Sequence, residues 1–388
     1  MKVASRAHVP PFAVMEIIAA ANARRAAGED VLNLGAGEPA AGASEVVRRR
    51  AIELLGAGDL GYTEALGVPA LREALARHYL DHHDLALDPA RIAVTTGSSG
   101  GFLLAFLAAF EAGDRVALAR PGYPAYANIL TALGCQVVSL PCGPATRFQP
   151  TVPMLDGAHA REPLDGLVVA SPANPTGTMI EAEELADLAR WCSEHGVRLV
   201  SDEIYHGITY TPARVGTAAR FGGWGAIVVN SFSKYWAMTG WRLGWMVLPD
   251  GLVAPVDALA GNLALCPPSL AQHAAIAALS PAGMAAARAN VERYAEARVQ
   301  LLERLPELGW TDVAPADGAF YLYADVSASG LDSVTWCARL LDEAGVALTP
   351  GTDFDPAGGH RCVRLSFASS AEVVSAAVDR IVAWQATL

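Results

Sequence analysis

The sequence has little that points to secretion or to nucleic acids. Its six cysteines form no Cys-x-x-Cys pair and show no short disulfide spacing. This pattern indicates a reducing compartment, in which the cysteines are small core residues. Forty acidic against 28 basic side chains give a formal net charge of −12, and no basic run interrupts this surplus. A partner with a phosphate backbone is therefore not expected.

No stretch has the composition of a membrane span or a signal peptide. Residues 258–287 lack a formal charge, but three prolines and several polar side chains interrupt them. Near the N-terminus, Pro10, Pro11 and Glu16 interrupt the apolar residues, and an amphipathic helix over 13–27 accounts for that stretch better. We expect a cytoplasmic protein.

The chain of 388 residues is long enough for two lobes with separate cores. Short apolar runs alternate with helical segments such as 101–111 and 181–195, which predicts a three-layer α/β/α lobe around a mostly parallel seven-stranded sheet. We expect its strands at 92–95, 115–119, 136–140, 167–170, 198–201, 227–230 and 243–248.

After Pro268 the pattern changes to long Ala/Arg/Glu helices with two further strands, which predicts a smaller α+β lobe. We expect its helices at 281–305 and 333–344 and its strands at 319–326 and 362–367. The expected division is an N-terminal segment, 1–41, that joins the small lobe, a large lobe, 42–268, and a small lobe, 269–388.

The most informative residues are those that follow the predicted strands, because ligands of parallel sheets bind beyond the carboxyl ends of the strands. Lys234 comes directly after the run at 227–230, among Ser231, Ser233 and Arg242. Nearby positive charge and partial burial favour a neutral, nucleophilic amine. Such an amine is suited to a Schiff base with an aldehyde cofactor that carries a phosphate.

Four other strand ends supply matching groups. The turn at 96–101, with Ser98 and Ser99, offers hydroxyls and backbone N–H groups to a phosphate. Tyr123 can stack on a ring, the Asn174 amide can reach a phenolic oxygen, and Asp202 can keep a pyridine nitrogen protonated. Each feature alone also fits an ordinary turn, cap or ion pair, but few cofactors other than pyridoxal 5′-phosphate require the whole set.

With these residues in place, the sequence resembles the class I/II aminotransferases, which are fold type I pyridoxal-phosphate enzymes. The resemblance runs from about residue 31 to 370, and residues 231–244 satisfy the family's lysine signature. It implies that Lys234 binds the cofactor covalently and then moves a proton between the substrate Cα and the cofactor. We expect transfer of an amino group from an L-amino acid to a 2-oxo acid by a ping-pong mechanism.

The same resemblance assigns the cofactor contacts. Asp202 would pair with the pyridine nitrogen, and Asn174 and Tyr205 would hold the phenolic oxygen. The ring would stack on Tyr123. The phosphate would be bound by Ser98, Ser99, Ser231 and Arg242.

The substrate and the subunit arrangement also follow from the resemblance. Arg364 resembles the arginine that holds the substrate α-carboxylate in a bidentate fork, with Gly37 and Asn174 beside it. Tyr62 resembles the tyrosine that reaches the phosphate of the neighbouring subunit. A homodimer with shared sites is therefore expected.

Two departures from the family pattern bear on the substrate. Pro39 is followed by Ala40 and Ala41 instead of Asp-Phe, and residues 98–101 lack the lysine of some dicarboxylate-specific members. Aspartate is therefore not the expected donor. Residues 11–14, Pro-Phe-Ala-Val, should line the pocket mouth and, with Tyr321, favour a neutral, apolar or aromatic side chain.

Three alternatives remain open on the sequence. His78 and His82 stand four apart on a predicted helix, followed by His83 and Asp84, so a metal enzyme is one of them. A second is a C–S β-lyase, cyclase or other eliminating enzyme with the same lysine and carboxylate. The third alternative is a cofactor-sensing regulator. Such a regulator would need a DNA-binding module, and the resemblance leaves no residues for one.

Overall fold

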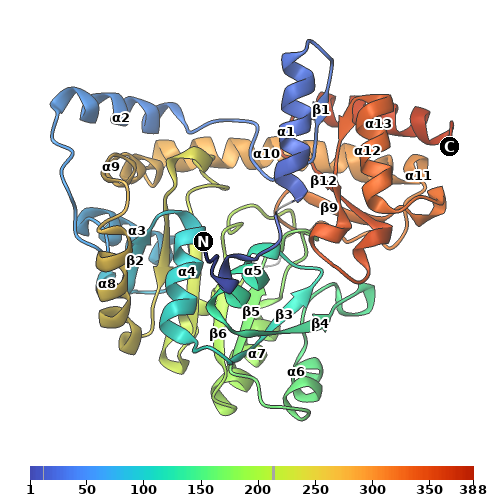
Figure 1. The fold of residues 1–388 in the computed structure, drawn as a ribbon. Coiled ribbons are helices and arrows are strands. Elements are labelled where there is room, and N and C mark those ends of the chain that lie inside the picture. The colour runs from blue at the N-terminus through green and yellow to red at the C-terminus, as the bar shows by residue number, and fades with distance from the viewer. Residues whose placement is uncertain (12, 212–214) are drawn as a thin grey trace.

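The structure is a computed structural model that describes residues 1–11, 13–211 and 215–388. Two lobes are visible in Figure 1, a large one around a central sheet and a smaller one formed mainly by the C-terminal residues. Helix α10 (Pro281–Glu303) runs from one lobe to the other. Within the described residues, no helix has the length and apolar character needed to span a membrane.

The large lobe contains a seven-stranded sheet with the order β2-β8-β7-β6-β5-β3-β4. Strands β4, β3, β5, β6 and β7 pair in parallel, and β8 runs antiparallel to both β7 and β2. This confirms the mostly parallel sheet predicted from the sequence. The strands are β2 (Ile92–Thr95), β3 (Arg115–Arg120), β4 (Gln136–Pro141), β5 (Gly166–Ala170), β6 (Arg198–Asp202), β7 (Ile227–Ser231) and β8 (Gly244–Val247).

Helices cover both faces of this sheet, as the absence of strict polar alternation in the strands predicts. Phe106 of α4 belongs to one buried cluster with Val229 of β7, whereas Leu188 of α7 belongs to the opposite cluster with Val228. One face is covered by α4 (Gly97–Ala109), α5 (Pro124–Leu133) and α8 (Asp250–Ala264), and the other by α3 (Pro69–His83), α6 (Val152–His159) and α7 (Ala182–Glu194).

Helix α4 begins four residues earlier than the sequence suggested. The Gly/Ser run expected as a turn forms the first turn of the helix, and the helix ends at Ala109. Gly97 makes this start possible because its φ is +67°, a conformation that L side chains rarely adopt. The backbone N–H groups of that first turn still lie beyond the end of β2, where the phosphate contact is expected.

The smaller lobe has an antiparallel sheet, β11-β12-β9, and two helices that pack on each other. Its strands are β9 (Tyr321–Asp325), β11 (Thr349–Pro350) and β12 (Cys362–Ser366), and its helices are α11 (Leu305–Leu308), α12 (Ser333–Ala344) and α13 (Ala371–Gln385). Asp332 and Ser370 cap α12 and α13 by accepting backbone N–H bonds in the first turn.

The N-terminal segment joins this smaller lobe. Strand β1 (Leu32–Asn33) pairs in parallel with β10 (Val346–Ala347), and α1 (Ala13–Ala26) packs against β10 and β11. Helices α2 (Glu45–Ala57) and α9 (Ser269–Ala278) pack on each other, and α9 also contacts α3. The division at residue 268 stays a prediction.

Candidate functional site

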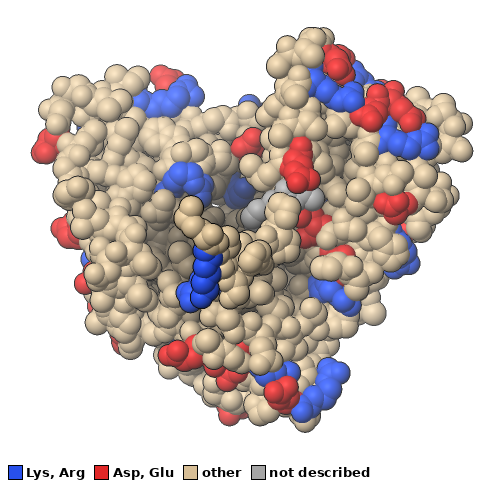
Figure 2. Space-filling model, in the orientation of Figure 1, with Lys and Arg blue, Asp and Glu red and all other residues tan. Residues whose placement is uncertain are grey.

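The candidate site lies where four neighbouring parallel strands end. Asp202 is the last residue of β6, and Lys234 lies in the turn after β7. Asn174 follows β5, and Tyr123 follows β3. Figure 2 shows a hollow between the two lobes with Lys and Arg side chains around it. Adjacent parallel strands deliver these groups to one edge of the sheet, as predicted.

The Lys234 amine lies among backbone and charged groups from both lobes. Its Nζ donates a hydrogen bond to the Gly37 carbonyl oxygen at 2.5 Å and lies 5.9 Å from the centroid of the Tyr205 ring. Burial, followed by the Arg364 guanidinium, lowers the pKa of Lys234 to about 8, while Glu38 opposes this shift. A substantial fraction of this amine is therefore neutral near neutral pH and can act as a nucleophile.

The Asp202 carboxylate is 4% exposed and faces the site from the end of β6. Its Oδ1 accepts a bond from the Ile204 backbone N–H at 3.1 Å, and its Oδ2 accepts one from the Tyr126 hydroxyl. Burial raises the pKa of Asp202 to about 6, against the two hydrogen bonds and the charge of Lys234. A buried anion of this kind favours a cationic N–H group as its ligand.

Arg364 on β12 brings the smaller lobe into the site. Its Nη1 donates to Asn174 Oδ1 at 2.8 Å, and its Nη2 donates to the Gly35 carbonyl oxygen at 2.7 Å. The guanidinium lies 4.5 Å from the centroid of the Tyr321 ring and 4.8 Å from that of Phe354. The two rings orient the plane of the guanidinium. Its Nε is buried without a hydrogen-bond partner among the described residues.

Two buried phenols connect Lys234 to the smaller lobe. The hydroxyls of Tyr205 and Tyr321 share a hydrogen bond of 2.7 Å, and Tyr321 also donates to the Gly37 carbonyl oxygen at 3.4 Å. Burial raises the pKa of Tyr205 well above its usual value, so the phenol keeps its proton and remains a donor. Because Asn174 Oδ1 accepts from Arg364, its two amide N–H donors remain for another acceptor.

The expected phosphate contacts are assembled only in part. The Arg242 guanidinium lies against Gly97 at the start of α4, so a side chain on Gly97 would collide with it. Gly244 also approaches closely, since a Cβ there would lie 2.9 Å from the Ser98 backbone nitrogen. The Ser231 hydroxyl contacts Ser233 Oγ at 2.8 Å and the Leu243 carbonyl oxygen at 3.0 Å.

Two expected phosphate ligands make no contact with this group among the described residues. Ser99 lines a separate groove of about 400 Å³, together with Leu103 and Leu263. Tyr62 is 86% exposed, and the next residue, Thr63, accepts a 2.9 Å bond from the buried Gln272 amide. The side chain of Tyr62 is thus free to contact another chain, as the expected shared site requires.

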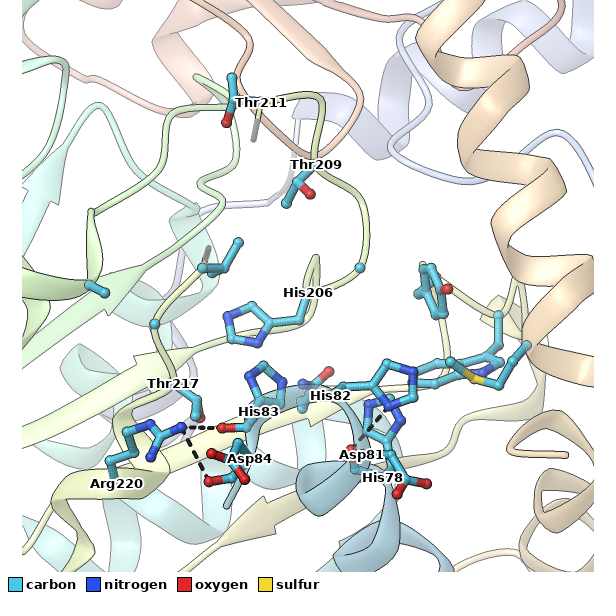
Figure 3. Close-up of a pocket in the computed structure, with 18 residues that line it drawn as sticks. His78, Asp81, His82, His83, Asp84, His206, Thr209, Thr211, Thr217 and Arg220 are labelled. Atoms are coloured by element: carbon cyan, nitrogen blue, oxygen red, sulfur yellow. Dashed lines mark hydrogen bonds between the residues drawn. The ribbon is translucent and has the colours of Figure 1, made fainter. Parts of the chain in front are cut away.

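The histidines considered as metal ligands lie around a different cavity, of about 840 Å³ (Figure 3). His78, His83 and His206 line this cavity. Arg220 donates hydrogen bonds to the backbone carbonyl oxygens of His83 and Asp84. Burial lowers the pKa of His78 to about 3 and that of His83 to about 4. In the part of the chain that the structure describes, no three His, Cys, Asp or Glu side chains are arranged to hold a metal ion.

Some functional contacts were not anticipated from the sequence. Phe354 and Thr349 hold Arg364 in place, the latter through a 3.3 Å bond to Nη2, and no local pattern marks either. Tyr126 could have been found, because it lies three residues after Tyr123 in the first turn of α5 and so on the same helix face.

The expected pocket mouth is described only in part. Phe12 lies outside the described residues, whereas Pro11 lines a cavity of about 340 Å³ beside Tyr123 and Phe354. This cavity adjoins the candidate site through Tyr123. That residues 11–14 line the substrate pocket stays a prediction.

Comparisons with known proteins agree with this geometry. A profile of the family "Aminotransferase class I and II" matches residues 29–381. The chain is 53% identical over 383 residues to a valine–pyruvate aminotransferase of Mycobacterium tuberculosis, covering 99% of this chain and 98% of that protein. It is also 33% identical to an aspartate aminotransferase of Thermotoga maritima, covering 96% of each.

Solved structures share the whole fold. The crystal structure of an aminotransferase from Mycobacterium tuberculosis superposes with a TM-score of 0.97 at 52% identity over 100% of both chains. The aspartate aminotransferase from Thermus thermophilus with maleate gives 0.92 at 33% identity over 99% of both. The fold is that of aspartate aminotransferase, and the relatives favour amino-group transfer over elimination.

Gly37 offers a test of how tightly the site is packed. A Cβ at Gly37 would lie 2.7 Å from the Tyr321 hydroxyl oxygen, whereas nothing lies within 4 Å of one at Gly42. We expect Gly37→Ala to lower the free energy of unfolding by about 1–3 kcal/mol because Tyr321 must shift. Gly42→Ala should change it by less than about 0.5 kcal/mol. If both variants unfold at the same urea concentration, Tyr321 moves aside without strain and the expectation is wrong.

Proposed function

Because the chain belongs to the class I and II aminotransferase family and is an aminotransferase, we propose that it binds pyridoxal 5′-phosphate at Lys234 and transfers the amino group of a neutral, apolar L-amino acid to a 2-oxo acid. The observation that carries this proposal is that a partly buried amine, Lys234, and a buried carboxylate, Asp202, lie at one edge of the sheet, after two adjacent parallel strands. Burial pushes each towards its neutral form, and each gains a partner of matching chemistry when this cofactor binds.

The residues present fit the cofactor along its length. Asp202 would hold the protonated ring nitrogen, and Tyr123 would stack on the ring. Asn174 has free amide donors, and Tyr205 has a protonated hydroxyl, for the phenolic oxygen. The phosphate would be bound by Arg242, Ser98, Ser99 and Ser231, together with the backbone N–H groups of the first turn of α4.

Lys234 has two roles in the proposed reaction. When bound, pyridoxal 5′-phosphate supplies an aldehyde carbon that carries the amino group and a ring that withdraws electrons from the substrate Cα. The neutral Nζ of Lys234 would hold the cofactor through that carbon until an amino acid replaces it. The released Nζ would then take the proton from the substrate Cα and carry it to the former aldehyde carbon of the cofactor.

Arg364 is proposed to orient the substrate. Its guanidinium plane is held by Tyr321 and Phe354, and a carboxylate that replaced its Asn174 and Gly35 contacts would form two parallel charge-assisted bonds. A side chain at position 37 would meet the Tyr321 hydroxyl. The glycine therefore leaves room for the substrate next to its α-carboxylate. The substrate Cα would then lie close to Nζ of Lys234, because the Gly37 carbonyl oxygen accepts from both Lys234 and the Tyr321 hydroxyl, and the Tyr321 ring packs on the Arg364 guanidinium.

A neutral, apolar side chain is the proposed donor specificity. The relative at 53% identity is a valine–pyruvate aminotransferase, whereas relatives that are aspartate or aspartate/prephenate aminotransferases are 32–36% identical. The Ala40-Ala41 sequence and the absence of lysine from residues 98–101 point the same way. Rings from Tyr123 and Tyr321 border the site and provide no cation for a second carboxylate.

We propose a homodimer in which Tyr62 reaches the neighbouring phosphate site. Tyr62 is exposed, and the adjoining groove presents Leu103 and Leu263, which are 39% and 57% exposed. An apolar surface of this kind beside a functional tyrosine is suited to a second copy of the chain. Sedimentation equilibrium that gave only monomer mass for the cofactor-loaded protein at micromolar concentration would contradict it.

A cytoplasmic location remains part of the proposal. All six cysteines are free thiols, and four of them are buried, as expected for core residues in a reducing compartment.

Lys234 can be tested with unusual clarity because the chain has only two lysines, Lys2 and Lys234. Borohydride reduction of the cofactor-loaded protein should fix a pyridoxyl group to the peptide that carries Lys234 and to no other. Lys234→Ala should abolish this labelling and lower kcat at least about 100-fold, because both the covalent bond and the proton carrier are lost. Lys2→Ala is the matched control and should change neither. Labelling of Lys2 instead would overturn the assignment.

The donor specificity can be tested by comparing amino acids with pyruvate as acceptor. We expect kcat/KM for L-valine to exceed that for L-aspartate at least about tenfold, because a second carboxylate would be buried without a counter-charge. Arg364→Lys should lower both values to a similar extent, since both donors share the α-carboxylate. A preference for aspartate or glutamate would refute the proposed specificity and leave the aminotransferase activity intact.

A further inference from the structure

Tyr126 contacts Asp202 although neither sequence motifs nor the expected cofactor contacts include it. Its hydroxyl donates a hydrogen bond to Asp202 Oδ2, while Oδ1 accepts from the Ile204 backbone. The phenol is the side-chain donor in this pair of hydrogen bonds. Tyr126 belongs to α5, a different element from the strand that carries Asp202.

Packing fixes the Tyr126 ring on both sides. The ring is 6% exposed, lies 4.9 Å from the Phe102 ring of α4 and meets the Tyr123 ring edge-on at 5.4 Å. Burial raises the pKa of Tyr126 well above its usual value, so the hydroxyl keeps its proton throughout the working pH range. The phenol is thus a fixed and permanent donor to Asp202.

Asp202 needs such a donor because burial opposes its charge. Burial raises its pKa to about 6, and the Tyr126 hydrogen bond is the first of the interactions that oppose this rise, ahead of Ile204 and Lys234. Glu203, whose pKa burial raises to about 8, is turned towards Thr217 and Ala218. The other titratable groups that interact with Asp202 are the phenols of Tyr123, Tyr205 and Tyr321.

We propose that Tyr126 is a positioning residue that keeps Asp202 ionised and directed at the ring nitrogen of the cofactor. The inference rests on the proposed function, because it takes pyridoxal 5′-phosphate as the ligand of Asp202. A protonated Asp202 could not hold a proton on that nitrogen, and the ring would then withdraw electrons from the substrate less strongly. Tyr126 keeps its own proton throughout, so Asp202 remains the anion of the pair.

The test is the pH dependence of cofactor binding to the protein freed of cofactor. Pyridoxal 5′-phosphate is titrated by tryptophan fluorescence between pH 5 and 9 in the wild type, Tyr126→Phe, Asp202→Asn and the double variant. We expect Tyr126→Phe to move the acidic limb of the binding profile upwards by roughly one to two pH units, the shift that corresponds to a lost hydrogen bond to a charged group. The loss of affinity should be largest near neutral pH and shrink as the pH rises.

Two variants make the result specific. Asp202→Asn should remove the limb, and in that background Tyr126→Phe should have no further effect, because the charge it supports is gone. Tyr79→Phe, which removes another buried phenol that bonds Trp245 instead, should leave the limb where the wild type has it. The acidic limb of the pH profile of kcat/KM should shift together with the acidic limb of the pH profile of cofactor binding.

An unchanged limb in Tyr126→Phe would overturn the inference, as would an equal shift in Tyr79→Phe or in the Asp202→Asn background. The proposed function fails separately, if the wild type neither binds pyridoxal 5′-phosphate nor transfers an amino group. Thermal melts followed by circular dichroism confirm that each variant is folded before titration.

Discussion

The site depends on burying groups of opposite charge at the ends of neighbouring strands. Asp202 and Lys234 are both removed from water, so the pKa of the first is raised and that of the second lowered. Neither group is stable there as an isolated ion, because desolvation disfavours charge. A ligand that offers a cationic N–H to one and an electrophilic carbon to the other relieves both penalties. The sheet sets the spacing, since β6 and β7 are adjacent parallel strands.

Three segments far apart in the sequence complete this arrangement. Gly37 follows β1, and its carbonyl oxygen accepts hydrogen bonds from Lys234 and from Tyr321 of the smaller lobe. Arg364 reaches from β12 to the Gly35 carbonyl oxygen and to Asn174 in the larger lobe. The substrate position is therefore defined only where the lobes meet. A shift of either lobe would change the distance between Arg364, which would hold the substrate carboxylate, and the amine of Lys234.

Most of the fold and the core of the site could be predicted from the sequence, because both follow from local patterns. Apolar runs bounded by turns placed the sheet strands within a residue or two of their ends, and β2 falls at the expected residues. Lys234 and Asp202 followed from the rule that ligands bind at strand ends. The start of α4 was misplaced because a Gly/Ser run is compatible with a turn and with a helix N-terminus. Phe354 and Thr349 depend on contacts between separate elements, which no local pattern encodes.

The most direct test of the central claim is the protonation state of the cofactor's ring nitrogen in the loaded protein. Pyridoxal 5′-phosphate labelled with nitrogen-15 can be bound to the wild type and to Asp202→Asn, and its chemical shift read by NMR at pH 7.5. The account predicts a protonated nitrogen in the wild type and an unprotonated one in Asp202→Asn. The same protonation state in both proteins would contradict it.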